Sequence, residues 1–369
     1  MGTTLLANDT AWALIVAATN CSYRPSDNLR AKFYLMVVVS PLLCSMGILG
    51  NSATIAVYLQ GSMRSANSYF LAALAFCDIG VLVSATMLYS VEILYDIMQD
   101  FRLYSAWMNY LQELFFLSHV FQMGAVYMTI SATAERWVAA MNSTRAKRLC
   151  SQRFALVTII VIMTLIIGFT FTKYLELRII RRPWCKNFAH YEVTVSEFGS
   201  NPTYIMVYVV WLTNVIVVFL PFILLTAMNI MITYITQNKT ASERGMEDAA
   251  VSLTIVATQE SRKVQQKRRE ANLVVVLVVT VFLICNSPGV MLTLTEQIDM
   301  DFLIEHDDLY SFMKDTTNML TIINSSINPI VYVIFGEEFR EVLLQLFRWC
   351  CCCSPERRQQ QTDNTTGNG

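Results

Sequence analysis

Charged residues are scarce in this chain. Asp, Glu, Lys and Arg make up 15% of its 369 residues, whereas 54% are hydrophobic, and the mean hydropathy is +0.44. A soluble domain of this length carries about a quarter charged residues. The composition therefore excludes an ordinary soluble protein, whereas the net charge of −1 excludes little.

Several functional signatures are also absent. The apolar stretch from Trp12 to Ala18 is short and follows Asp9 rather than a basic region, so it is not a convincing cleavable signal peptide. There is no His-Glu-x-x-His, Gly-x-Ser-x-Gly or Walker A motif, and we therefore do not expect an enzyme. The ten cysteines lack the spacing of a metal site. We predict no cofactor and no nucleic-acid partner.

Long apolar segments are what the chain has instead. A bilayer core is about 30 Å thick, and about 20 apolar residues in a helix cross it. Seven segments of this kind run approximately from Phe33 to Leu59, Ser68 to Leu94, Trp107 to Val138, Phe154 to Tyr174, Tyr204 to Tyr234, Leu273 to Leu294, and Leu309 to Phe335. The sequence therefore predicts an all-α membrane protein. Transporters commonly contain internal repeats, and none is visible here.

Basic residues predict the orientation of the chain, because short cytoplasmic loops are rich in Lys and Arg. They concentrate after the third segment, before the sixth and in the tail. We therefore expect a multi-pass plasma-membrane protein with an extracellular N-terminus, and Asn8 and Asn20 become glycosylation candidates. The predicted divisions are an extracellular N-terminus (1–32), a seven-helix domain (33–335), an amphipathic interfacial helix (336–349) and a lipidated, disordered tail (350–369).

The last apolar segment carries unusual residues for a membrane helix. Asn324, Asn328 and Tyr332 are polar, and Pro329 removes a backbone hydrogen bond and leaves a bend. Polar groups in a membrane helix are costly and usually face the interior of a bundle. The segment is therefore expected to be deformable and functional.

An amphipathic stretch follows at residues 336–349. Its apolar residues recur at helical spacing, and charged residues occupy the other side, which is typical of a helix lying at the membrane surface. We therefore expect contact with membrane lipid. The next four residues are cysteines placed for S-palmitoylation, namely Cys350, Cys351, Cys352 and Cys353.

Short motifs in these segments resemble those of the rhodopsin-like G-protein-coupled receptors, from Phe33 to Cys353. In chain order they are Gly50-Asn51, Leu74-Ala75-Phe76-Cys77-Asp78, Glu135-Arg136-Trp137, Pro221, Cys285-Asn286-Ser287-Pro288 and Asn328-Pro329-Ile330-Val331-Tyr332. Each motif is weak alone, but their order is specific. The resemblance implies a seven-helix bundle that activates a heterotrimeric G protein. It also implies that the conformational switch consists of Asn51, Asp78, Glu135, Arg136, Pro288, Asn324, Asn328, Pro329 and Tyr332.

Asp78 is an acid at the depth of the membrane centre, and it needs polar partners there. Asn51, Asn324 and Asn328 can supply them, either as a fixed polar knot or as a conformational switch. In the family a sodium ion often lies near this acid. The third-helix Ser of that site is Ala125 here, which disfavours sodium.

The family restrains the Arg of the third helix with its acidic neighbour, a role that Glu135 would have toward Arg136. Many members add a second acid at the start of the sixth helix. This chain has Lys267-Arg268-Arg269 in the matching region, so the second restraint is not expected.

Two further departures from the family concern its outer half. The Cys at the outer end of the third helix is replaced by Leu111, whereas its usual partner, Cys185, is present. Cys21 is the other cysteine on the outer side, and we predict a Cys21–Cys185 bridge, with a free Cys185 as the alternative. The sixth-helix Trp is replaced by Asn286, so a rotating indole is not available to move Pro288.

Ligand contacts are inferred from matching positions. Ser118, Gln122 and Asn318 are candidates, and Ser118 stands where amine receptors have an Asp, which disfavours an amine. Ile322 stands where opsins have a Lys, which disfavours retinal. His119 is interpreted as a packed, hydrogen-bonded residue.

Acidic residues gather in the expected outer loops and segment ends. A negative rim attracts cationic ligands, and Glu92, Glu113 and Glu296 are candidates to bind an Arg. A solvated acidic loop is the alternative. The loop between the fourth and fifth segments is basic instead, and it either faces the ligand or packs within the protein.

A narrower resemblance concerns invertebrate FMRFamide-type neuropeptide receptors. It rests on segments such as Gln122 to Tyr127, Tyr174-Leu175-Glu176-Leu177-Arg178, Cys285-Asn286 and Asn324 to Asn328. The resemblance implies a peptide ligand ending in an amidated Arg-Phe. A transporter and a non-peptide receptor remain as alternatives.

Overall fold

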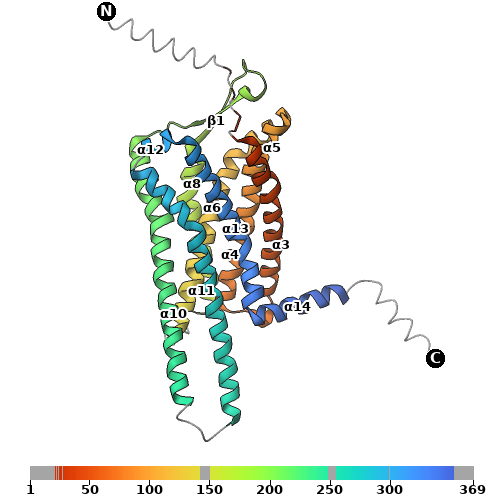
Figure 1. Cartoon of the computed structure of the whole chain (residues 1–369), viewed down its shortest axis with the longest axis vertical. Helices are drawn as coiled ribbons and strands as arrows, with labels where there is room; N and C mark the ends of the chain where they lie inside the picture. Colours follow the sequence, from red (N-terminus) through yellow and green to blue (C-terminus); the bar gives the residue numbers. More distant parts are fainter. Residues whose placement is uncertain are drawn as a thin grey trace, which may run out of the picture.

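The structure is a computed structural model, and it describes residues 21, 23, 25, 26, 28–141, 150–247, 255–298 and 300–352. Asn8, Asn20 and Cys353 lie outside these residues. Seven helical segments in the described part are long and apolar enough to cross a membrane, as the sequence predicts. They lie side by side in one bundle (Figure 1).

Several of the seven crossings combine α-helix with π-helical turns. The first contains α2 (Leu29–Lys32), η1 (Phe33–Val39) and α3 (Ser40–Tyr58), and the second contains α4 (Ala66–Ala85), η3 (Thr86–Ser90) and α5 (Val91–Met98). The third is α6 (Phe101–Ala140) and the fourth is α8 (Gln152–Glu176). The fifth contains α9 (Pro202–Tyr204), η5 (Ile205–Phe219) and α10 (Leu220–Glu247), the sixth is α11 (Ile255–Ile298) and the seventh is α13 (Asp307–Phe335). Two single-turn helices, η2 (Gly61–Met63) and η4 (Asn187–His190), lie in connections.

Helices α6 and α11 are longer than the apolar segments that predicted them. Hydrophobicity marks the part that matches the lipid core, but a helix continues wherever polar residues allow it. The start of α6 is fixed by Asp100, whose side chain accepts a hydrogen bond from the Arg102 amide at 2.8 Å. Ser65 and Ser151 cap α4 and α8 in the same way.

Two short strands interrupt the helices in the described part of the chain. Strands β1 (Leu177–Arg181) and β2 (Tyr191–Val195) form an antiparallel hairpin, with Leu177 opposite Val195 and Arg181 opposite Tyr191. The hairpin lies at one end of the bundle (Figure 1), which we call the hairpin end, together with α12 (Met300–Glu305). The basic loop between the fourth and fifth crossings is therefore folded.

Helix α14 (Glu337–Cys352) lies at the other end, which we call the α14 end. It is separated from α13 by Gly336, where a Cβ atom would lie 2.8 Å from the Tyr332 carbonyl oxygen. A side chain larger than hydrogen would therefore clash at this turn. The predicted break between the seventh crossing and the amphipathic helix is present. The helix extends beyond the expected residue 349 and includes Cys350, Cys351 and Cys352.

Buried apolar residues form clusters at both ends. At the α14 end, Tyr58, Tyr332 and Phe339 join α3, α13 and α14. At the hairpin end, aromatic residues of α5, α6 and the hairpin turn pack together, among them Tyr104 and Phe188. Leu111 is buried in this second cluster. Apolar packing therefore contributes to holding the hairpin against α6.

Candidate functional site

A cavity of about 100 Å³ lies inside the bundle, between α4 with η3, α6 and α13. Ser118, Gln122 and Asn318 all line it. These three residues are candidate ligand contacts from the sequence, and they come from two helices that the fold brings together. The cavity is therefore the candidate ligand site.

The lining of this cavity is polar but neutral. Besides the three candidate contacts, it includes Ser84, Tyr89, Thr317 and Thr321, and none of the described residues that line it is charged. The Tyr89 hydroxyl donates a hydrogen bond to Asn318 Oδ1 at 3.2 Å. An ionised group entering the cavity would lose its hydration without gaining a counter-charge. The cavity is therefore suited to a neutral group that forms hydrogen bonds.

The three candidate acids lie elsewhere. Glu92 is half-buried on α5, where Asp96, Lys32 and Asp315 are its charged neighbours. Glu296 is half-buried near the end of α11 and accepts a hydrogen bond from the Tyr310 hydroxyl at 2.9 Å. Glu113 is exposed on α6. None of the three acids lines the cavity, so a contact between them and a ligand would form outside it.

The residues before the first crossing are fastened to the hairpin end. Cys21 and Cys185 form a disulfide, the pairing that the sequence predicts. The Tyr23 hydroxyl donates a hydrogen bond to Asp96, and the Ser26 amide donates to the same carboxylate at 3.0 Å. Burial and this carboxylate raise the pKa of Tyr23, which keeps its hydroxyl protonated as a donor. Disulfide and carboxylate together hold the N-terminal segment beside the hairpin.

Three basic residues at the end of the fourth crossing and in the loop after it have partners within the protein. Lys173 Nζ lies 2.7 Å from Glu176 Oε1, Arg182 pairs with Glu192, and Arg181 lies over the Tyr191 ring. These contacts favour the packing interpretation of the basic loop. Arg178 is exposed.

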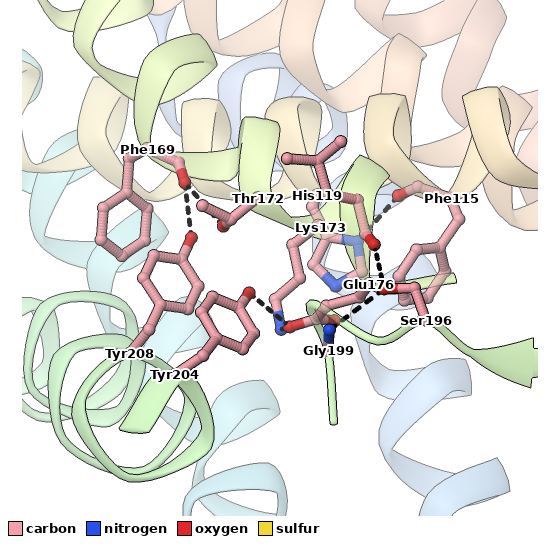
Figure 2. A network of polar contacts seen from close by, with 11 residues as sticks. Phe115, His119, Phe169, Thr172, Lys173, Glu176, Ser196, Gly199, Tyr204 and Tyr208 are labelled. Carbon is pink, nitrogen blue, oxygen red and sulfur yellow. Dashed lines mark hydrogen bonds and ion pairs between the residues drawn. The ribbon is translucent and has the colours of Figure 1, made fainter. Parts of the chain in front are cut away.

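His119 is a packed residue, as its sequence context indicates. Its Nδ1 atom lies 2.8 Å from the carbonyl oxygen of Phe115, and the ring is beside Lys173 and Glu176 (Figure 2). The adjacent Ser118 lines the cavity. Neighbouring positions of α6 therefore face the cavity and the fourth crossing.

The predicted polar residues of the bundle centre lie together. Asn328 Nδ2 donates to Asp78 Oδ2 at 2.8 Å, and both residues are buried. Asn324 is half-buried one turn before Asn328 on the same helix. Within the described part of the chain, Asp78 Oδ1, Asn51 Oδ1 and the Tyr332 hydroxyl have no hydrogen-bond partner. The site therefore holds polar atoms that a rearrangement can satisfy.

The sodium site that the sequence disfavours would lie beside Asp78, where Ala125 stands in place of a Ser. Ala125 is buried and contributes no side-chain oxygen. In the described residues, no group of three His, Cys, Asp or Glu side chains is arranged to hold a metal.

Prolines in the fifth, sixth and seventh crossings each leave a backbone carbonyl without its helical donor. Pro329 frees the Ser325 carbonyl, which accepts from Asn51 Nδ2 at 2.8 Å. Pro288 frees the Ile284 carbonyl, and the Ser287 hydroxyl donates to it at 2.9 Å. Side chains thus replace the missing amide donors at both bends.

Pro221 follows the π-helical segment η5, in which an amide donates to the carbonyl five residues earlier. The backbone carbonyl that Pro221 leaves without a donor is therefore that of Ile216. The Tyr127 hydroxyl, on α6, donates to the Ile216 carbonyl at 3.0 Å. Asn286 keeps a local role, because its amide donates to the Phe282 carbonyl at 2.8 Å.

Glu135 and Arg136 form the expected ion pair near the α14 end. Arg136 Nε lies 2.6 Å from Glu135 Oε2, and the Glu135 side chain is 6% exposed. The side chains of Lys267, Arg268 and Arg269 lie outside the described part. Glu135 is thus the ion-pair partner of Arg136 in this structure.

Sequence reasoning missed several residues of these sites. Tyr89, Thr317 and Thr321 line the cavity, and Tyr127 and Ser287 supply the replacement donors. Polar side chains at helical spacing in apolar segments were the available signal. Spacing alone cannot tell which of these side chains face a neighbouring helix and which form a hydrogen bond only with the backbone of their own helix.

Comparison with known proteins assigns the chain to a family. The family "7 transmembrane receptor (rhodopsin family)" matches residues 50–332 of the chain. The structure resembles that of squid rhodopsin, with a TM-score of 0.65 at 14% sequence identity and coverage of 94% of both chains. This second likeness concerns the fold alone.

Curated relatives include two receptors named for a peptide. The FMRFamide receptor of Drosophila melanogaster is 26% identical over 329 residues, which are 87% of this chain and 55% of that receptor. The chain therefore spans little more than half the length of the fly protein. The FMRFamide peptide receptor frpr-18 of Caenorhabditis elegans is 25% identical over 322 residues, covering 85% of this chain and 69% of that receptor.

Proposed function

Because this chain belongs to the rhodopsin family of seven-transmembrane receptors, we propose that it binds an extracellular neuropeptide and activates a heterotrimeric G protein. The family consists of signalling receptors rather than enzymes, and the chain is a multi-pass membrane protein related to FMRFamide receptors. The ligand and the coupling are the proposed part. A basic peptide ending in an amidated Arg-Phe is the first candidate ligand.

The cavity between η3, α6 and α13 carries this proposal. Its neutral amide and hydroxyl lining suits a terminal carboxamide, which donates and accepts hydrogen bonds without charge. A free carboxylate in the same place would be desolvated without a cation beside it. An amidated peptide therefore fits the lining better than the corresponding acid.

The surroundings of the cavity suit the basic part of such a peptide. Asp315 lies on α13, which forms part of the cavity wall, and Glu92 lies on α5, which directly follows η3. The Nζ atom of Lys32 is 3.8 Å from Asp315 Oδ2. Glu296 lies on α11 at the same end. A ligand Arg would find carboxylates there for bidentate hydrogen bonds.

The α14 end is the proposed G-protein side. Arg136 is held by Glu135 in this arrangement, and release of that pair would free the guanidinium for a partner. The hairpin end is then extracellular, which agrees with the expected glycosylation at Asn8 and Asn20. Cys350 to Cys353 remain the proposed palmitoylation sites, and the amphipathic pattern of α14 suits a position at the membrane surface.

A screen of amidated neuropeptides with a nucleotide-exchange readout tests the proposal. Membranes that express the chain should exchange nucleotide on addition of an Arg-Phe-amide peptide, and the free-acid form of the same peptide should be much weaker. The response should vanish in Arg136→Ala. Substrate flux without nucleotide exchange would contradict the proposal and favour a transporter, and a response confined to non-peptide ligands would contradict its peptide part.

A further inference from the structure

We propose that Glu176 is a positioning residue for ligand binding, because it fastens the base of the β1–β2 hairpin to the start of the fifth crossing. The inference rests on the proposed receptor function. Glu176 is the last residue of α8, and β1 begins at the next residue. It therefore lies where the chain leaves the fourth crossing and enters the hairpin.

The side chain of Glu176 joins two crossings. Its Oε1 atom accepts from Lys173 Nζ at 2.7 Å and from the Tyr204 hydroxyl at 2.7 Å. Lys173 is on α8, whereas Tyr204 is in α9 at the start of the fifth crossing. Figure 2 shows both donors directed at this one carboxylate. The carboxylate therefore fixes the distance between the two crossings at the hairpin base.

The backbone of Glu176 holds the other strand. Its carbonyl oxygen accepts from the Ser196 amide at 2.8 Å, directly after β2 ends. The Ser196 hydroxyl donates to the Leu175 carbonyl at 2.5 Å and accepts from the Gly199 amide at 3.0 Å. The end of α8, both strands and the approach to α9 thus meet within a few residues.

Gly199 gives independent evidence that this junction is tight. A Cβ atom on Gly199 would lie 2.8 Å from Val195 Cγ1 and 2.9 Å from the Glu176 carbonyl oxygen. Both distances are shorter than van der Waals contact, so a larger residue would push the segments apart. The junction therefore has one close-packed arrangement rather than a range of them.

The charge of Glu176 is better explained by positioning than by stability. The Lys173 and Glu176 side chains are 13% and 16% exposed, and burying an ion pair costs about as much free energy as its attraction returns. A pair of apolar residues would stabilise the junction as well. An ion pair with an added phenol donor, however, tolerates little change in geometry.

The junction is connected to the ligand cavity in two ways. The hairpin rests on the start of α6, where the Tyr191 hydroxyl lies 3.0 Å from Ser105 Oγ, and its turn is tied to the N-terminal segment by Cys185. His119 lies beside the Lys173–Glu176 pair, and its neighbour Ser118 lines the cavity. A shift of the hairpin base would therefore change the entrance and one wall of the site.

The first experiment needs no ligand. Amide hydrogen exchange of residues 177–195 is measured in the full-length receptor in detergent, for the wild type and for Glu176→Ala. Exchange in the two strands should quicken by about tenfold in the variant, since one charge-assisted contact is lost. Glu197→Gln is the matched control and should leave exchange unchanged, because Glu197 is exposed in the connection after β2. Unchanged exchange in Glu176→Ala would overturn the inference.

The second experiment measures signalling with Phe-Met-Arg-Phe-amide as the probe. Half-maximal concentration should rise by about tenfold in Glu176→Ala at equal surface level and equal maximal response. Tyr204→Phe and Gly199→Ala should shift it in the same direction. The exchanged pair Lys173→Glu with Glu176→Lys should recover part of the potency, because the ion pair returns while the Tyr204 hydroxyl loses its carboxylate acceptor. Lower surface level with unchanged potency would show a merely structural role and overturn the inference. A wild-type receptor that ignores the probe would contradict the proposed function, while the exchange measurement would still decide the role of Glu176.

Discussion

At the hairpin end of the bundle, a disulfide and three ion pairs fasten the chain, namely Cys21–Cys185, Lys32–Asp315, Lys173–Glu176 and Arg182–Glu192. In the half nearer α14, the described residues include one ion pair, Glu135–Arg136. The other polar contacts there include neutral pairs, such as Asn51 with the Ser325 carbonyl, and contacts of one ionisable group with a neutral one, such as Asp78 with Asn328.

The difference follows from solvent and suits the proposed function. The ion pairs at the hairpin end are partly exposed, so they keep some hydration that a pair at the bundle centre would lose. Neutral amide and hydroxyl donors cost less to bury and less to rearrange. In the proposed receptor, the hairpin end would hold the ligand site in place, and the bundle interior would change its hydrogen bonds. Four predictions test this contrast, from the largest effect to the smallest.

Removal of the Arg136 guanidinium should have the largest effect. Arg136→Ala should abolish peptide-dependent nucleotide exchange while peptide binding persists, because the proposed partner contact lies at the α14 end. Arg153→Ala is the control, since Arg153 is exposed at the start of α8. Equal signalling by Arg136→Ala and wild type would remove Arg136 from the switch.

Breaking the disulfide should affect the hairpin end alone. Cys21→Ser and Cys185→Ser should each destabilise the receptor by about 2–5 kcal/mol and weaken peptide binding. The double variant should be no worse than either single one, because both changes remove the same bond. Thermal unfolding in detergent measures this. Cys150→Ser, a free cysteine outside the hairpin end, should leave binding unchanged, and additive effects in the double variant would contradict a shared bond.

Two acids should differ because the structure places them differently. Glu92 is half-buried near Lys32 and Asp315, so Glu92→Gln should weaken a basic peptide by about 2–5 kcal/mol. Glu113 is exposed, so Glu113→Gln should cost less than about 1 kcal/mol. Glu296→Gln should lose about as much peptide affinity as Glu92→Gln, because Glu296 is also half-buried, beside Tyr310. Competition binding ranks the three variants, and a larger loss in Glu113→Gln than in Glu92→Gln would refute the assignment.

The replacement donors at the prolines should give the smallest effects. Tyr127→Phe leaves the half-buried Ile216 carbonyl without its side-chain donor and should cost about 1–3 kcal/mol of stability. Tyr34→Phe removes an exposed hydroxyl and should change stability by less than about 0.5 kcal/mol. Thermal unfolding of both variants gives the comparison. Equal effects would mean that the Tyr127 hydrogen bond adds nothing at Pro221.

Much of the α14 half could be predicted from the sequence. Asp78, Asn328 and Asn51 are polar residues in apolar helices, and the cost of burying them unpaired brings them together. The contact between Glu135 and Arg136 could be predicted because the two residues are adjacent in the chain. The donors at Pro221 and Pro288 could not be assigned, because Tyr127 comes from another helix and Ser287 is one of many hydroxyls in α11.

The hairpin end was less predictable. The basic loop gave no strand signal strong enough to predict β1 and β2, because short strands depend on what they pack against. Glu113 and Glu92 look equivalent in the sequence, yet the rotation of each helix leaves one exposed and the other half-buried. The role of Glu176 at the hairpin base depends on Ser196 and Tyr204, which lie 20 or more residues away in the chain.

The sequence by itself determined the seven crossings, the class of receptor and the polar residues of the bundle centre, because lipid forces long apolar helices and makes every buried polar group costly. Tertiary structure alone decided which of the polar residues share a cavity, which acids remain exposed and which side chains satisfy the carbonyls freed by proline. Those outcomes depend on how helices rotate and pack against one another, and that packing is set by contacts between residues far apart in the chain.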